Sequence, residues 1–404
     1  MDLTLRPVTE DELPEFARWV TRAFHGDVKD EDLEDWKIWF EIERSLAAFD
    51  GDRIVGTAGA LSYELTVPGG SLPAAGVTVV SVRSTHRRRG VLSSMMRHQL
   101  DDVRDRGEAI AILWASESII YGRFGYGMAA PDVTLEIERR HGRLAMPFES
   151  PGEIQLLERE EAEKILPSLY EQIRPTYPGM LGEDPSRWQL MFNDRESHRD
   201  GMSSNRYVSY EENGESLGFL RYRAKGEWDE GFARGKVTTP QLMALTPNAY
   251  KALWSHLLNL DLVESIAAYH RPATEPLGMM LADPRRLRAR LSDGLWLRIL
   301  DVPTALETRR YRQAGSLVLE VADPLRYAAG RFRLEGDIDG AEVTSTDAEP
   351  DLTLDAAALG AAYLGGTRVM ALAEAGLIQG EAEAIRRADI MFGWDRPTWI
   401  PWIF

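Results

Sequence analysis

The clearest periodic pattern of apolar and polar residues begins at residue 77. Residues 77–82 are a hydrophobic run that predicts a strand, and a basic turn ending at Gly90 follows it. After the turn, apolar residues recur about every 3.6 positions, which predicts an amphipathic helix that ends at Gly107. The apolar positions of this helix are Val91, Leu92, Met95, Met96, Leu100 and Val103.

The N-terminal pattern predicts helices packed on a largely antiparallel sheet. Residues 9–12 (Thr-Glu-Asp-Glu) form a capping-box sequence, which predicts the start of a helix. Strands are expected at residues 45–49 and 54–63, joined by an Asp-Gly-Asp hairpin turn. Further strands are expected at residues 109–114 and 133–138. This mixture of strands and amphipathic helices indicates the α+β class.

The chain has 404 residues, which is too long for a single core, and the pattern restarts twice. A new series of helices and hairpins begins near residue 146 and includes a helix that Thr246 and Pro247 should open. A third series begins at residue 294 with a strand at residues 295–300. The sequence therefore predicts three domains, at residues 1–145, 146–293 and 294–404.

Composition narrows the classes of partner. The formal charge of −17 argues against nonspecific binding to nucleic acid, and it favours cationic small molecules if the carboxylates line a cleft. No apolar run is long enough to span a membrane and no signal-peptide pattern opens the chain, so we expect a cytoplasmic protein. The absence of cysteine excludes disulfides and thiolate chemistry, and we expect no metal.

Against this acidic background, the basic turn is the best candidate for a binding site. Arg87, Arg88 and Arg89 precede Gly90 between a buried strand and a helix. The first turn of a helix offers free N–H groups and a favourable dipole to an anion, and the arginines add positive charge. Neither a nucleoside-triphosphate loop nor a dinucleotide-binding glycine pattern occurs nearby, so the turn suits a pyrophosphate held in another way.

Three motifs carry a family resemblance. Residues 85–90 (Thr-His-Arg-Arg-Arg-Gly) are followed by residues 114–117 (Trp-Ala-Ser-Glu) and residues 120–127 (Ile-Tyr-Gly-Arg-Phe-Gly-Tyr-Gly). The first and third resemble the signature of GNAT acyltransferases, and the set is similar to the Eis (enhanced intracellular survival) family of aminoglycoside N-acetyltransferases. The resemblance extends through residues 293–299 (Asp-Gly-Leu-Trp-Leu-Arg-Ile) to a C-terminal region like sterol carrier proteins, and so covers almost the whole chain.

This resemblance implies two tandem GNAT-like domains, each a mixed sheet flanked by helices, followed by a sterol-carrier-like α/β domain. It also implies acetyl coenzyme A as cosubstrate and a homohexamer. Leu92 departs from the glycine or alanine common in GNAT proteins, and Arg87 replaces a common glutamine. The implied coenzyme contacts are Val80, Ser81, Val82, Arg88, Arg89, Gly90, Val91, Leu92, Ser93, Tyr121 and Gly122.

The resemblance further implies direct acetyl transfer within a ternary complex. The terminal carboxylate of Phe404 would be the general base and the phenol of Tyr126 the general acid. Structural alternatives exist for both, because Tyr126 could only pack beside the coenzyme and Phe404 could only fill an apolar surface. Glu117 and Glu64 are alternative bases. His86 fits a structural role in the turn better than that of a base.

Phe24, Asp27 and Trp36 lie where the family builds its acceptor pocket, and aromatic walls with a carboxylate suit an amino sugar. Phe24 also fits the buried face of its own helix. The leading hypothesis is acetyl transfer to the amines of small molecules, with aminoglycosides as substrates. Acetylation of lysine in peptides by the same site is an alternative. A lipid-binding protein with a vestigial acyltransferase domain is another, since residues 363–377 are largely apolar.

Overall fold

The computed structural model describes residues 3–182 and 185–404, and its internal contacts divide the chain into two units. The first unit combines the described residues up to 130 with residues 294–395 and 404. The second combines the described residues of 131–293 with residues 396–403. The part of the chain that is described contains no helix long and apolar enough to cross a membrane.

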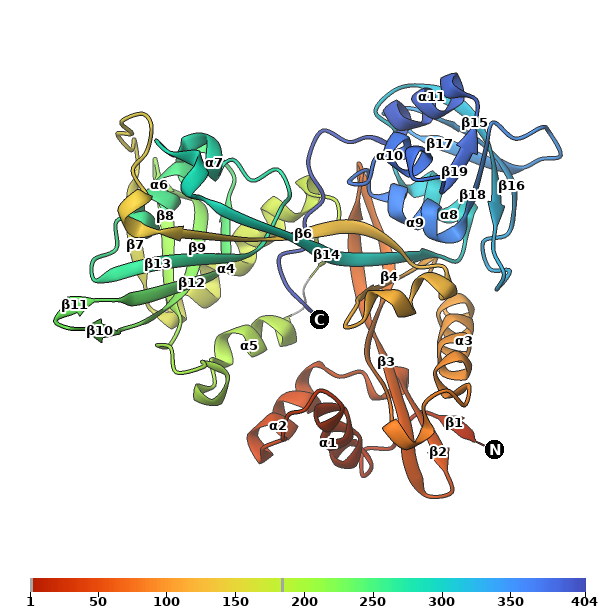
Figure 1. Cartoon of the computed structure of the whole chain (residues 1–404), viewed down its shortest axis with the longest axis horizontal. Helices are drawn as coiled ribbons and strands as arrows, with labels where there is room; N and C mark the ends of the chain where they lie inside the picture. The colour runs from red at the N-terminus through yellow and green to blue at the C-terminus, as the bar shows by residue number, and fades with distance from the viewer. Residues whose placement is uncertain (1–2, 183–184) are drawn as a thin grey trace. The chain divides into compact units, whose positions relative to one another are not determined.

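The main sheet of the first unit is mixed, as the sequence predicts (Figure 1). Its strands, in spatial order, are β1 (Thr4–Arg6), β2 (Ser45–Asp50), β3 (Arg53–Val67), β4 (Gly70–Val82), β5 (Ile110–Trp114) and the end of β14 (Arg288–Ile299). Only β4 and β5 run parallel; the other neighbours are antiparallel. The strand expected at residues 295–300 of the third domain thus pairs with β5, and it is absent from the five-stranded sheet described below.

Three helices accompany this sheet: α1 (Leu13–Ala23), α2 (Asp30–Trp39) and α3 (Val91–Asp105). Helix α3 packs on β2, β3 and β4 and buries the apolar face that its sequence predicts, except that Leu92 is only partly buried. Gly107 follows it with φ of 77°, and Glu108 N–H reaches back to the carbonyl of Val103, which confirms the predicted C-terminal cap.

Helix α1 begins later than its capping sequence suggests. The Glu12 carboxylate accepts the N–H of Thr9 at 2.9 Å, as a capping box requires, but it also accepts two hydrogen bonds from Arg6. Residues 10–12 form a turn, and the regular helix starts at Leu13. The helix therefore starts several residues later than the capping sequence predicts, and Glu12 is shared between the cap and the ion pair with Arg6.

The rest of the first unit is a five-stranded sheet with four helices. The strands, in spatial order, are β17 (Ala341–Ser345), β16 (Gly330–Gly336), β15 (Gly315–Ala322), β18 (Leu352–Asp355) and β19 (Ile378–Gly380), and the helices are α8 (Val302–Thr308), α9 (Ala356–Tyr363), α10 (Val369–Glu374) and α11 (Ala382–Phe392). The fully buried Arg309 donates hydrogen bonds to the carbonyls of Tyr363 and Phe392, at the ends of α9 and α11. A cation at two helix C-termini complements both dipoles.

The second unit repeats the plan of the main sheet of the first. Its strands, in spatial order, are β6 (Gly127–Glu138, of which residues 131–138 belong here), β13 (Val263–Arg271), β12 (Gly235–Ala244), β9 (Glu215–Lys225), β8 (Arg206–Glu212) and β7 (Glu153–Leu157). Strands β12 and β13 run parallel and are joined by α6 (Pro247–Leu258), whose N-cap Thr246 accepts the N–H of Ala249, as predicted. Two helices, α4 (Arg159–Ile173) and α5 (Pro185–Asn193), complete this GNAT-like plan, together with a small hairpin of β10 (Trp228–Asp229) and β11 (Phe232–Ala233) and the short helix α7 (Leu277–Met280).

Two tryptophans near the end of the chain, Trp399 and Trp402, pack into the second unit. The Trp402 ring stacks on Tyr170 with centroids 4.7 Å apart. Trp399 is buried, and its indole N–H donates to the carbonyl of His270 at 2.5 Å. These contacts fix residues 396–403 on the second unit rather than leaving a frayed tail.

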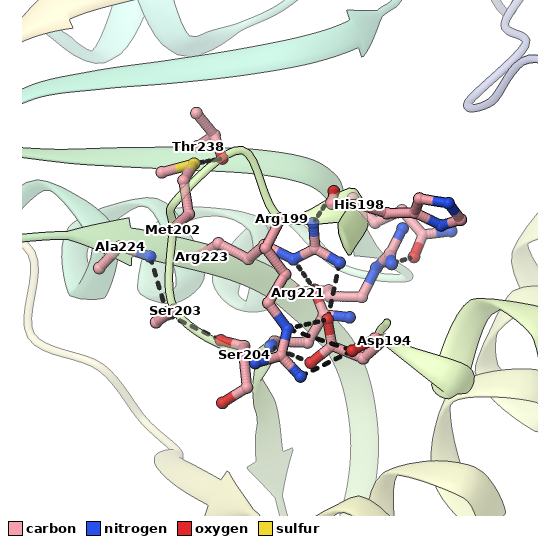
Figure 2. A network of polar contacts seen from close by, with 12 residues as sticks. Asp194, His198, Arg199, Met202, Ser203, Ser204, Arg221, Arg223, Ala224 and Thr238 are labelled. Carbon is pink, nitrogen blue, oxygen red and sulfur yellow. Dashed lines mark hydrogen bonds and ion pairs between the residues drawn. The ribbon is translucent and has the colours of Figure 1, made fainter. Parts of the chain in front are cut away.

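An arginine network fastens one loop of the second unit to β9 (Figure 2). The Asp194 carboxylate accepts from Arg223 at 2.7 Å and from Arg199 at 3.2 Å, and it also accepts the N–H of Asn205. Arg223 additionally donates to the carbonyl of His198 at 3.0 Å. One carboxylate thus holds together both ends of the loop between α5 and β8.

We expect Asp194→Ala to destabilise the protein by about 2 kcal/mol, because two partly buried guanidinium groups would lose their carboxylate. Thermal unfolding of the variant would measure this loss. Glu196→Ala removes an exposed carboxylate of the same loop and should leave the unfolding midpoint unchanged. Equal midpoints for the two variants would show that the network does not stabilise the loop.

Candidate active site

Strand β4 of the first unit contains a bulge that opens the sheet. In the described part of the chain, β4 pairs with β5 from Ala74 opposite Ile110 to Val77 opposite Leu113, and the pairing ends there. Val79 has φ of 51°, which is rare for a β-branched residue, and the pairing with β3 shifts register beside it. The hydroxyl of Thr57 donates to the carbonyl of Val79 at 2.8 Å and holds the bulge.

A cleft of about 620 Å³ lies in the first unit, against the end of β4 that follows the bulge. Its walls come from β4, the basic turn, the first turn of α3, the end of α1 and residues 116–123. Nine of the residues expected to bind coenzyme line it: Val80, Ser81, Val82, Arg88, Gly90, Val91, Leu92, Ser93 and Tyr121. Arg89 and Gly122 are not among the lining residues, whereas Arg87, Ser116 and Glu117 are.

The basic turn is shaped for an anion. Arg88 has φ of 62° and Gly90 has φ of 83°, so the chain turns sharply just before α3. The N-cap residue of α3 is Gly90, which has no side chain that could cap the first turn, and Arg87 and Arg88, just before it, line the cleft. The first-turn N–H groups and the positive end of the helix dipole therefore follow directly after two arginines. This donor set fits the pyrophosphate of coenzyme A.

The second unit has no such turn at the corresponding place. Its helix α6 begins at Pro247, after Leu245 and the N-cap Thr246, and the Thr246 hydroxyl already accepts the N–H of Ala249 in the first turn. Proline removes another donor. We therefore assign the anion site to the first unit.

Tyr126 is completely buried, just after the left-handed Gly125. Its ring meets that of Tyr121 edge-on at 6.0 Å, and within the described residues its hydroxyl has no hydrogen-bond partner. Burial raises the pKa of the Tyr126 phenol above its ordinary value, while the positive charge of Arg298 acts in the opposite direction. The phenol is therefore protonated at neutral pH. Tyr126 is not among the residues that line the 620 Å³ cleft.

Phe404 packs on the same two strands that form the bulge. Its ring lies 5.0 Å from that of Tyr63 on β3, and it also approaches Gly76 on β4. Strand β4 continues from Gly76 to the lining residues Val80, Ser81 and Val82. The first unit therefore contains both Phe404 and Tyr126.

The structure does not bring the three expected acceptor residues together in the cleft. Phe24 lines it and is 54% exposed, because α1 ends at Ala23, so Phe24 is not a core residue. Trp36 is buried and packs on Phe16 and Phe40, which makes it a core residue of the helical pair. Asp27 is exposed and outside the lining.

The alternative bases are distributed differently. Glu117 lines the cleft, whereas Glu64 is an exposed residue of β3 outside the lining. The His86 ring lies 2.8 Å from the Thr85 hydroxyl through Nδ1 and 3.2 Å from the Asp50 carboxylate through Nε2. Both ring nitrogens thus have partners, which fits the structural role expected for this residue.

Models of known protein families match three segments of the chain. The acetyltransferase (GNAT) domain matches residues 4–129, and a second acetyltransferase (GNAT) domain family matches residues 179–299. The sterol carrier protein domain matches residues 302–401. These matches confirm the predicted fold class, whereas the domain boundaries after residues 145 and 293 stay predictions.

Whole-length relatives match as well. An uncharacterized N-acetyltransferase of Streptomyces avermitilis is 40% identical over 99% of both chains. The N-acetyltransferase Eis of Mycobacterium tuberculosis is 33% identical over 98% of both chains. The crystal structure of Eis1 from Mycobacterium abscessus superposes with a TM-score of 0.87 at 34% identity, and the match covers 99% of this chain and 100% of that one.

Proposed function

The chain belongs to the Eis family of N-acetyltransferases in the GNAT superfamily, and from this premise we propose that it transfers acetyl from acetyl coenzyme A to the amines of small molecules. GNAT acetyltransferases use acetyl coenzyme A. The observation that carries the proposal for this chain is the cleft, because it joins an uncapped, arginine-flanked helix start to a bulged strand with unpaired backbone groups.

When bound, acetyl coenzyme A supplies the acetyl thioester. Arg87, Arg88 and the first-turn N–H groups of α3 would hold its pyrophosphate. Backbone groups of Val80, Ser81 and Val82 would pair with its amides and orient the thioester carbonyl, since β5 does not use this part of β4. The remaining requirements are a group that removes a proton from the amine and a group that donates one to the leaving thiolate.

We assign these two roles to Phe404 and Tyr126. A main-chain carboxylate has a reference pKa of about 3.3–3.7, so at neutral pH the carboxylate of Phe404 is charged and can attract an ammonium group and accept its proton. The protonated Tyr126 phenol has an unused donor hydrogen. We propose direct transfer in a ternary complex, because Phe404 acts here as base and Tyr126 as acid, and neither role forms an acetyl-enzyme intermediate.

For the acceptor we propose aminoglycosides. The charge of −17 favours a polycationic substrate, and the exposed Phe24 ring with Glu117 gives the cleft an aromatic and an acidic wall. Steady-state assays with acetyl coenzyme A should give higher kcat/KM for aminoglycosides than for lysine peptides of matched charge. Higher kcat/KM for the peptides would instead favour the lysine acetyltransferase alternative.

A cavity within the sterol-carrier-like region supports the lipid-binding alternative less well than the cleft supports acetyl transfer. A cavity of about 190 Å³ in this part of the chain is lined by several charged residues, including Glu383, Arg386 and Arg387. Such a lining does not suit a lipid tail. The proposed homohexamer rests on the family resemblance, and sedimentation of the purified protein would test the assembly. The cytoplasmic location stays a prediction from the sequence.

The basic turn can be tested with a matched pair of glycines. Gly90 and Gly107 flank α3 with φ of 83° and 77°, and a β carbon would meet no neighbour at either position. Alanine should therefore cost a similar ~1 kcal/mol of stability at both. We expect only Gly90→Ala to weaken binding of coenzyme A, by about tenfold in calorimetric titration, because it distorts the turn. Equal affinities in the two variants would exclude the turn as the pyrophosphate site.

A further inference from the structure

Arg298 is a fully buried arginine in the motif at residues 293–299. The proposed function gives this arginine no role. It lies on β14 opposite Ala111 of β5 in the first unit. Its Nη2 donates to the Asp323 carboxylate at 2.5 Å, and both side chains are almost completely excluded from solvent. Burying such a pair has a desolvation cost that can exceed the attraction between the two charges, so stability alone does not explain why the pair is present.

Asp323 is itself held rigidly. Its Oδ1 accepts the N–H of Leu325 at 3.0 Å, and its Oδ2 accepts the N–H of Ala328 at 2.9 Å. The two hydrogen bonds therefore hold the carboxylate in a fixed position relative to the backbone of the loop after β15, in the sterol-carrier-like part of the chain. Through this carboxylate, that loop fixes the position of the Arg298 guanidinium.

The other side of the guanidinium lies against Gly125. A β carbon at this glycine would come within 2.5 Å of Nη1 and 2.7 Å of Cζ, so the close approach requires glycine, as does its φ of 81°. Nε and Nη1 are buried and have no hydrogen-bond partner within the described residues. The next residue is Tyr126, whose buried hydroxyl also lacks a partner there.

We propose that Arg298, anchored by Asp323, is a positioning residue that fixes Gly125 and Tyr126 and stabilises the charge that Tyr126 acquires during acetyl transfer. This inference rests on the proposed function. When Tyr126 acts as acid, its O–H bond breaks, an S–H bond forms on the leaving coenzyme, and the negative charge remains on the phenolate until solvent returns a proton. A buried phenolate needs a nearby positive charge, and Arg298 supplies one.

The charges around Tyr126 agree with this role. Burial and the neighbouring Tyr121 raise the pKa of the Tyr126 phenol, and Arg298 is the group that lowers it. Nη2 of Arg298 donates to Asp323, and the other two guanidinium nitrogens, Nη1 and Nε, lie on the side of Gly125. The sterol-carrier-like region thus contributes to the acetyl-transfer site through one ion pair.

A double-mutant cycle tests the coupling. Arg298→Lys should lower kcat about tenfold in the otherwise unchanged protein, less than the ~100-fold effect of losing a direct donor, with little change in KM for acetyl coenzyme A. In the Tyr126→Phe background the same change should have no further effect on kcat. Arg309→Lys, at another fully buried arginine, is the matched control and should leave kcat unchanged in both backgrounds.

If Arg298→Lys does not fold, the double variant Arg298→Met/Asp323→Leu removes both charges without leaving one unpaired, and it should lower kcat at least as much. Equal losses with and without the Tyr126 hydroxyl would overturn the inference while leaving acetyl transfer intact. A lack of acetyl transfer in the unchanged protein would instead refute the proposed function.

A readout without turnover completes the test. In protein labelled with carbon-13 at the tyrosine Cζ, the Tyr126 signal can be assigned by its loss in Tyr126→Phe. We expect this signal to shift in Arg298→Lys and to stay in place in Arg309→Lys. An unmoved signal in Arg298→Lys would overturn the inference whatever the activity of the protein.

Discussion

Tyr126→Phe should lower kcat about 100-fold while the affinity for coenzyme A stays unchanged. The substitution removes one buried hydroxyl that has no partner within the described residues, so the packing of the ring should survive. What is lost is the proton donor for the leaving thiolate. Single-turnover kinetics and calorimetric titration with coenzyme A would separate the chemical step from binding.

The matched control for this prediction is Tyr121→Phe. Tyr121 lines the cleft, its ring is 6.0 Å from that of Tyr126, and burial raises its pKa to about 12. It is therefore another buried phenol of the same site, without the proposed role of acid. Comparable losses of kcat in the two variants would mean that Tyr126 contributes by packing rather than by proton donation.

The second large effect is expected at Phe404. Two glycines appended after this residue should lower kcat about 100-fold, because they move the charged carboxylate away from the amine while the ring can stay on Tyr63. Phe404→Leu keeps a carboxylate at the same position and changes only the ring, so its kcat should fall much less. Comparing the two variants at saturating acetyl coenzyme A would make the distinction.

The opposite ranking would contradict the proposed base. If the extended protein kept full activity, the proton would have to leave by another route, and Glu117 would become the first candidate because it lines the cleft. Glu117→Gln would then be the next variant to measure.

Local patterns in the sequence predicted the secondary-structure elements that surround the cleft. The basic turn and α3 were predicted because a 3.6-residue period, an arginine run and two glycines all lie within a short stretch of chain. The cap at Thr246 was predicted for the same reason, since its signal and its consequence are three residues apart. In these places local propensity and the final fold agree.

The bulge at Val79 could not be predicted. A run such as Val77-Thr78-Val79-Val80 has the same apolar character with or without an extra residue, and the bulge is held by Thr57 on another strand. The place of β14 was missed for a similar reason. Its pairing with β5 joins segments nearly two hundred residues apart, and nothing in either segment specifies the other.

The acceptor residues show a different limit. Helical periodicity placed Phe24 on the buried face of α1, but the helix ends one residue earlier and leaves the ring exposed in the cleft. Trp36 was expected to face the acceptor, yet Phe16 and Phe40 enclose it. The Arg298–Asp323 pair was also missed, because a charge in a strand gives no sign that it will be buried.

We propose above all that the first unit catalyses acetyl transfer from acetyl coenzyme A to an amine. The most direct measurement is release of the coenzyme thiol by the purified full-length chain, with acetyl coenzyme A and an aminoglycoside supplied together and singly. We expect thiol release only with both present, in equal amount to the acetylated amine. Thiol release without an amine, or none with any amine while coenzyme A still binds, would contradict it.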